Sequence, residues 1–129
     1  MKIGVIVEAQ EGLGWDAWRR LAACIEALGF DSLWRSDHLL STIDEGREAN
    51  DTWVALTVAA LETKRLQIGS LVSPLTFRHP AMLAKVAASV DTLSAMVSLT
   101  SRRIPVHSVF MHIVIDADMY VCMCVPCIL

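Results

Sequence analysis

The chain has 129 residues, of which 54% are hydrophobic and 19% are charged, and its formal net charge is −3. This length allows one domain with a real core, and the hydrophobic content excludes a disordered chain. The slight acidity argues against nucleic acid or an anionic membrane as the main partner.

The N-terminus leads directly into a strand pattern, so we expect no secretory signal. The longest uncharged apolar run, Met119–Leu129, is shorter than the roughly 18 residues that a membrane span needs. Cys24 lies in a helical pattern, whereas Cys122, Cys124 and Cys127 crowd the C-terminus. This distribution is not a disulfide framework, and it predicts a cytoplasmic protein in a reducing environment.

Apolar runs at Ile3–Val7, Ser32–Arg35 and Leu66–Val72 predict three short strands. Each run is followed by polar residues and then by a segment with helical periodicity. Repeating strand–helix units of roughly thirty residues build parallel sheets, whose chemistry lies at the carboxyl ends of the strands. We therefore expect an α/β fold with its functional residues at the rim of the sheet, the edge formed by the carboxyl ends of the strands.

The first predicted helix begins near Trp15 and ends near Leu28, with Gly29 as its stop signal. Its periodicity predicts one buried face that includes Trp15, Trp18, Leu21, Ala22, Ile25 and Leu28. A polar, acidic loop spans residues 39–50, where an α/β enzyme commonly places specificity elements.

The second predicted helix spans Thr52–Glu62, with Asp51 as its N-cap. Its buried side is expected to include Trp53, Leu56, Ala60 and Leu61. The third begins at Pro80, a favoured first-turn residue, and continues to Leu93. At Ser94 the helical pattern ends and the strand–helix rhythm stops. Beyond it, apolar runs at 104–115 and 119–129 are compatible with an antiparallel hairpin.

Three segments together resemble the luciferase-like flavin and deazaflavin oxidoreductases: Ile3–Gly12, Phe30–Leu39 and Leu71–Ser94. The likeness is greatest to the branch that uses the deazaflavin coenzyme F-420. There a strand ending in Ser-Asp-His, here Ser36 to His38, meets the cofactor. A Thr-Phe-Arg-His-Pro segment, here Thr76 to Pro80, opens the third helix. The resemblance covers residues 1–94 and is specific as a set, because order and spacing agree across three units.

The family fold is an eight-stranded barrel of about 250 residues. The resemblance therefore implies a partial TIM (β/α)8 barrel, with three N-terminal units in a domain of residues 1–94. After the third helix the family continues with a Gly-Gly-Arg turn and a glycine-rich strand, whereas here Ser94 is followed by Ala95-Met96-Val97-Ser98. We expect residues 95–129 to be a divergent tail of a truncated or frame-shifted gene product.

Asp37 and His38 are the leading candidates for chemistry. By resemblance, His38 approaches the reactive face of a flavin-like ring, where an imidazole with a reference pKa of about 6.5 can orient a substrate or exchange a proton. Asp37 would hydrogen-bond the ring or fix the imidazole tautomer. The alternative is that both residues only cap the loop that follows them.

Two further rim segments are candidates for the cofactor and substrate pocket. Glu8 and Gln10 follow the first strand and would shape the pocket, or else form a solvated loop. Leu71, Val72 and Ser73 end the third strand, where the family has a non-prolyl cis peptide that supports the middle ring of the cofactor. The Leu71–Val72 bond is the expected position of that cis peptide.

Arg78 and His79 precede the third helix and could bind an anion at its N-terminus, although an ion-pair role for Arg78 is favoured. The tryptophans at positions 15, 18 and 53 have core spacing, so packing is favoured over a cofactor role, and Trp34 is expected to fill the space beside its strand.

The C-terminal cysteines allow a zinc site with His107 and His112, or a redox dithiol at Cys124 and Cys127. Both interpretations are weaker than that of ordinary apolar cysteines, and we expect no metal.

The function implied by resemblance is oxidoreductase or monooxygenase chemistry on a small organic substrate. The cofactor would be coenzyme F-420, with FMN as the alternative. Because five barrel units are absent from the pattern, we expect this chain to be inactive alone. A different hypothesis is a non-catalytic association module. In either case exposed sheet edges predict a homo-oligomer or an aggregate.

Overall fold

The structure, a computed structural model, describes residues 2–41, 43–74, 76–97 and 119–124, with side chains described as far as Ser94. The described elements follow in the order β1 (Lys2–Val7), a 3-10 turn (Ala9–Glu11), α1 (Trp15–Ala27), β2 (Ser32–Arg35), α2 (Thr52–Glu62), β3 (Gln67–Ser70), α3 (Pro80–Val97) and β4 (Met119–Cys124). Three consecutive strand–helix units therefore occupy the positions that the sequence predicts for them.

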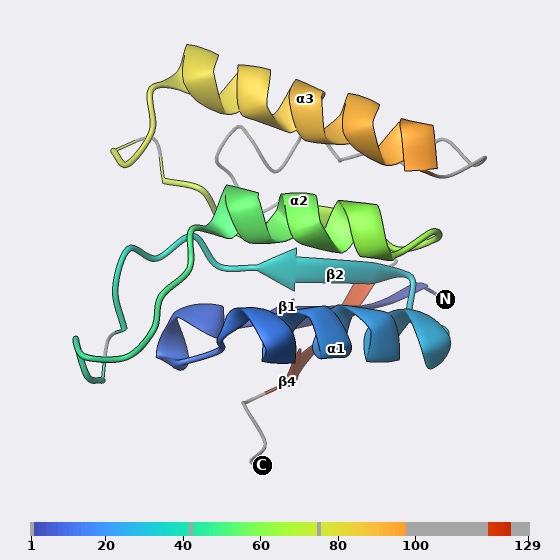
Figure 1. Cartoon of the computed structure of the whole chain (residues 1–129), viewed down its shortest axis with the longest axis horizontal. Coiled ribbons are helices and arrows are strands. Elements are labelled where there is room, and N and C mark those ends of the chain that lie inside the picture. Colours follow the sequence, from blue (N-terminus) through green and yellow to red (C-terminus); the bar gives the residue numbers. More distant parts are fainter. Residues whose placement is uncertain (1, 42, 75, 98–118, 125–129) are drawn as a thin grey trace.

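The four described strands form one parallel sheet in the order β3-β2-β1-β4. Val5 lies beside Leu33, and Leu33 lies beside Ile68, so β1, β2 and β3 end at the same rim. In Figure 1 the arrowhead of β2 points left, and the long loops after β2 and β3 lie at that end. The expected parallel α/β fold is confirmed, and strand ends from three units meet at one edge.

The three helices lie side by side, with α2 between α1 and α3, and α2 packs against β3 (Figure 1). Side chains from both layers form a continuous core in which Trp18, Leu33, Leu56, Ile68 and Leu83 are almost fully buried. Burial of a large apolar side chain contributes about 1.5–3 kcal/mol, so this interface is the main source of stability for the rim above it.

Trp34 lies on the opposite face of the sheet from Leu33, because side chains alternate along a strand. Its indole occupies space that glycines leave open on the two neighbouring strands, Gly4 on β1 and Gly69 on β3. The ring is 6% exposed, and its Nε1 donates a 2.9 Å hydrogen bond to Ser32 Oγ. The expectation that Trp34 fills space beside its strand is confirmed.

Local signals set several element boundaries. The Asp51 carboxylate accepts hydrogen bonds from the backbone amides of Trp53 and Val54, so it is the N-cap of α2. Gly29 has a φ of 87°, a conformation that favours glycine and ends the first helical segment after Leu28. Both predictions are confirmed, whereas α3 runs past Ser94 to Val97.

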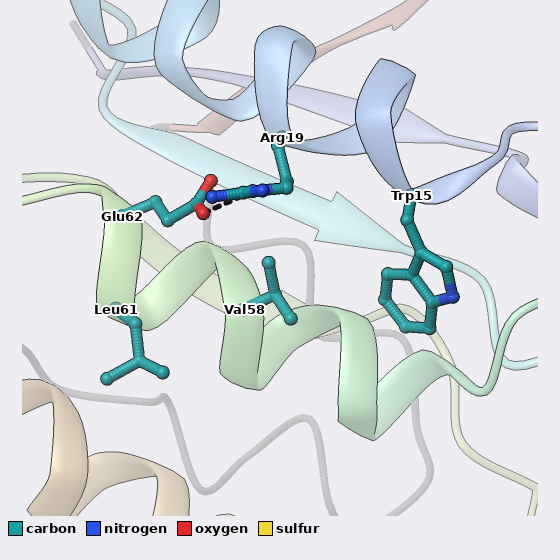
Figure 2. Close-up of a pocket in the computed structure, with 5 residues that line it drawn as sticks. All are labelled: Trp15, Arg19, Val58, Leu61 and Glu62. Carbon is teal, nitrogen blue, oxygen red and sulfur yellow. Dashed lines mark hydrogen bonds and ion pairs between the residues drawn. The ribbon is translucent and has the colours of Figure 1, made fainter.

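Three expectations about the buried helix faces are wrong. Trp15, Leu28 and Leu61 are 37%, 70% and 45% exposed. Leu28 is the C-cap residue and lies beyond the last helical turn, so the periodicity of α1 does not direct it to the core. Trp15 and Leu61 line a shallow groove on the outer surface between α1 and α2, as Figure 2 shows.

The tail contributes one described strand. β4 pairs in parallel with β1, from Lys2 beside Met119 to Val7 beside Cys124. The expected antiparallel hairpin would pair this segment with residues 104–115, which lie outside the described part of the chain, so the hairpin stays a prediction. Among the helices that the structure describes, none is both long and apolar enough to cross a membrane.

Candidate functional site

The first rim segment follows β1 and forms a short 3-10 turn rather than a solvated loop. Gln10 is 4% exposed, and its Nε2 donates a 2.7 Å hydrogen bond to Glu8 Oε2. Ser36 Oγ, at the end of β2, lies 2.7 Å from Glu8 Oε2 and 2.9 Å from Gln10 Oε1. These contacts join the ends of β1 and β2 and fix the Glu8 carboxylate at the rim.

The second rim segment places two adjacent residues in opposite environments. Asp37 is 3% exposed, whereas the side chain of His38 is 49% exposed. His38 Nε2 lies 4.0 Å from Glu8 Oε2, so the imidazole faces the carboxylate of the first segment. The arrangement gives a solvent-accessible imidazole beside a fixed acid, above a buried aspartate.

The third rim segment follows β3 and contains the cis peptide bond, which lies between Leu71 and Val72, the position predicted for it. Ser73 is 3% exposed, and its Oγ donates a 2.7 Å hydrogen bond to Asp37 Oδ2. The same oxygen accepts a 3.0 Å hydrogen bond from Trp53 Nε1. Val72 is 40% exposed and Leu71 is half-buried, so the segment offers apolar surface beside the polar network.

Arg78 joins the second and third segments to the start of α2. Its Nε and Nη2 donate hydrogen bonds of 3.1 and 3.2 Å to the two Asp37 oxygens, and Nη2 lies 2.6 Å from Asp51 Oδ2. Hydrogen bonding to Asp37 is the main reason that the pKa of Arg78 is raised. The favoured ion-pair role of Arg78 is confirmed. His79 is exposed, and its Nδ1 accepts a hydrogen bond from the amide of Ala81.

The pKa of Asp51 reflects the same network. Burial raises it, but hydrogen bonds from Arg78 and from the amides of Val54 and Trp53, with the positive charge of Arg78, outweigh burial. The pKa therefore lies below its ordinary value of 3.8. Asp51 is thus an ionised link between the helix cap and the rim.

A second arginine lies beneath the rim. Arg35 is 1% exposed, its guanidinium stacks 5.0 Å from the Trp18 ring, and its Nη2 donates a hydrogen bond to the Asn50 carbonyl. Burial lowers the pKa of Arg35 to about 10, while Asp51 and Asp37 raise it. Two arginines and two aspartates therefore form a charge-balanced cluster under His38.

All seven predicted site residues lie at this rim, and hydrogen bonds connect four of them into two pairs. Glu8 and Gln10 bond to each other, and Asp37 bonds to Ser73. Sequence reasoning gave no separate role to Ser36, Thr52 or Ser70. The hydroxyls of Ser36 and Ser70 contact these pairs, and Thr52 Oγ1 donates to the Ser36 carbonyl. The available signal was their position at strand and helix ends, where parallel strands bring polar side chains together.

The groove in Figure 2 lies on the outer surface, between α1 and α2. Trp15, Arg19, Val58, Leu61 and Glu62 line it, and Arg19 pairs with Glu62 across it. Within the residues whose side chains are described, no cluster of histidine, cysteine and acidic side chains could hold a metal. The zinc and dithiol interpretations depend on C-terminal cysteine side chains that lie outside that part.

Comparison with known proteins identifies the family. Residues 1–95 match the family of luciferase-like monooxygenases. The chain belongs to this family. Over 70 residues it is 41% identical to an F420-dependent glucose-6-phosphate dehydrogenase from Amycolatopsis mediterranei (strain U-32). That match covers 54% of this chain and 21% of the relative's length, so the chain spans about a fifth of that protein.

Solved structures support the same fold. An F420-dependent secondary alcohol dehydrogenase in complex with an F420-acetone adduct gives a TM-score of 0.66 at 22% identity, over 75% of this chain and 29% of that one. The oxygenating constituent of 3,6-diketocamphane monooxygenase from Pseudomonas putida, in complex with FMN, gives a TM-score of 0.61 at 24% identity. The likeness covers 76% of this chain and 28% of that one. The described part of the chain is a partial barrel of this type.

Proposed function

We propose that the rim is the ring-facing part of a flavin- or deazaflavin-dependent oxidoreductase site for a small organic substrate. The observation that carries the proposal is the placement of His38. Its imidazole is half-exposed, lies 4.0 Å from the fixed Glu8 carboxylate and follows a fully buried aspartate. An imidazole held in this way suits proton exchange with a bound substrate, or the orientation of that substrate.

The described residues fit the ring of such a cofactor better than its anionic tail. Val72 and Phe77 expose 40% and 43% of their surface on the loop after β3, which gives apolar support for a planar ring. The cations of the described rim loops are already paired, Arg47 with Glu11 and Arg78 with two aspartates. A phosphate tail would therefore need residues other than these two arginines.

Coenzyme F-420 is the preferred cofactor, because the relative with 41% identity is named as dependent on it. FMN is the alternative, because one structural neighbour was solved with it. When bound, coenzyme F-420 would supply hydride transfer, and FMN would supply hydride or oxygen chemistry. In this proposal His38 contacts the ring and either orients the substrate or moves a proton. Asp37, Leu71, Val72 and Ser73 support the ring, and Glu8 and Gln10 shape the pocket.

Two further features belong to the proposal. Residues 1–94 form the barrel-like unit and residues 95–129 a divergent tail, because the family match ends at residue 95. The distribution of cysteines supports a cytoplasmic location. With three of the eight barrel units, the chain would bind the cofactor weakly and turn over little or no substrate.

Titration of coenzyme F-420 and of FMN, followed by absorbance and fluorescence, tests the proposal. We expect weak binding to the wild-type chain, further weakened in His38→Ala. His79→Ala is the matched control, since His79 is also exposed but lies at the start of α3. Equal losses in both variants would contradict the role of His38. A tight stoichiometric complex would contradict the expected weakness.

A second candidate function is non-catalytic self-association. Its supporting observation is the sheet order, in which β3 is the last of the described strands on one side and pairs with β2. An outer strand accepts another strand through its backbone groups. Association with unchanged cofactor absorbance in every titration would favour this candidate over the enzyme.

A further inference from the structure

We propose that Arg78 is a positioning residue that closes the neck of the loop carrying His38, a role that rests on the function proposed above. The loop comprises residues 38–50 and connects β2 to α2; we call it the β2–α2 loop. Its neck consists of the residues on either side, Ser36 and Asp37 before it and Asp51 and Thr52 after it. His38 is the first residue beyond the neck.

A single guanidinium holds both sides of the neck. Arg78 bonds to both oxygens of Asp37 on one side and to Asp51 Oδ2 on the other. Arg78 itself belongs to the next strand–helix unit, just before α3. The planar fork of arginine suits this bidentate contact, which restricts orientation as well as distance.

Two other hydrogen bonds join the two sides of the loop, one within the neck and one between the residues next to it. Thr52 Oγ1 donates to the Ser36 carbonyl over 2.7 Å, and Arg35 Nη2 donates to the Asn50 carbonyl over 2.5 Å. These contacts are mostly buried, since Thr52 and Arg35 are each 1% exposed. The neck is therefore closed by side chains of its own strand–helix unit, and Arg78 is its link to the next unit.

The burial of Asp37 makes its ion pair with Arg78 important for the position of this chain segment. Its side chain is 2% exposed and that of Arg78 is 24% exposed, so water screens the pair poorly. Loss of the arginine would leave a buried carboxylate with Ser73 as its remaining described side-chain donor. Arg35 would still act on Asp37 through its charge, but it makes no hydrogen bond to that carboxylate. A buried charge with so few hydrogen bonds is unfavourable, so the chain segment at Asp37 would move toward water and carry His38 with it.

The far part of the β2–α2 loop has a separate anchor. Ser41 Oγ donates to Glu11 Oε2 over 2.6 Å and accepts from the amides of Ile43 and Asp44. Arg47 Nη1 lies 3.6 Å from Glu11 Oε2. Release of the neck would therefore loosen the side of the loop that bears His38 before the side held by Glu11.

Amide hydrogen exchange on the full chain, resolved by mass spectrometry, tests the proposal. Arg78→Gln is expected to raise exchange at residues 37–40 at least tenfold while α1 retains wild-type exchange. Arg78→Lys keeps the charge but loses the fork, so partial rescue is expected. Arg19→Gln is the matched control, because it breaks the Arg19–Glu62 ion pair on the outer surface. It should leave residues 37–40 unchanged.

A uniform rise in exchange across β1, α1 and the loop would overturn the proposal, since it would show general destabilisation. If Arg78→Gln does not fold, Asp51→Asn provides the test, because asparagine still caps α2 but removes one charged partner of Arg78. Wild-type exchange at residues 37–40 in the folded variant would contradict the neck closure. If the wild-type chain bound neither cofactor, the proposed function would be contradicted instead. Failure of the function and failure of the neck closure can therefore be told apart.

Discussion

The contact between Trp34 and Gly69 leads to a sharp prediction for Gly69→Ala. A Cβ at position 69 would lie 2.6 Å from Cζ3 and 3.0 Å from Cε3 of the Trp34 ring. The nearest atoms belong to a rigid aromatic ring that is 6% exposed, so it has little room to move. The alanine would therefore force a shift of the indole or of β3.

The magnitude follows from two opposing effects. Overpacking of a buried site costs about 1–3 kcal/mol. Replacement of glycine by alanine within a strand recovers about 0.5–1 kcal/mol of chain entropy, because the backbone of the unfolded chain becomes less free. We expect Gly69→Ala to lower the free energy of unfolding by about 1–2 kcal/mol.

Urea denaturation of the full chain, followed by circular dichroism, measures this loss. The informative comparison is a double-mutant cycle with Trp34→Phe, which removes the part of the ring that meets the new methyl group. In that background Gly69→Ala should cost less than about 0.5 kcal/mol. Equal costs in the two backgrounds, or stabilisation by Gly69→Ala alone, would refute the reasoning.

Three further predictions concern the network and the assembly state. The pKa of Asp51 is lower in the folded chain than its ordinary value of 3.8. Ionised Asp51 therefore stabilises the fold fully above pH 3.8, and this stabilisation is lost as the pH falls through the lowered pKa. Asp51→Asn should flatten the acid side of a plot of urea midpoint against pH, and an unchanged slope would contradict this. Trp53→Phe removes a 3.0 Å buried hydrogen bond to Ser73 and should cost about 1 kcal/mol in urea denaturation; a neutral effect would count against the bond. Light scattering at micromolar concentration should give a mass above the 14.2 kDa of one chain, and a monodisperse monomer would contradict association.

Local rules predicted most of the element boundaries. The strand at Ser32–Arg35 and the helix at Thr52–Glu62 were both predicted with the bounds that the structure has. Their signals are short-range: a β-prone run between turns, and an N-cap followed by a helical period. Side-chain burial was less predictable, because the exposure of Trp15 and Leu61 depends on the spacing between two helices.

The location of the rim was predicted, but the hydrogen bonds and ion pairs among its side chains were not. Parallel strands made it possible to expect Glu8, Asp37 and Ser73 at one edge, which the strand register and their contacts confirm. The sequence could not indicate that Asp37 is directed to Arg78, since the two residues lie in different units. Long-range pairing of charges depends on the relative placement of complete units, which local patterns do not encode.

The placement of β4 has a consequence for reassembly of a complete barrel from pieces. In a closed eight-stranded barrel, the first strand has the second strand on one side and the eighth on the other. Here β4, a six-residue strand, pairs with β1 on the side away from β2 and in the same parallel direction. It therefore occupies the place of a closing strand. A separately produced fragment with the remaining units would have to displace β4 to close onto β1, so complementation would be a strand-exchange reaction whose rate is limited by the opening of β4.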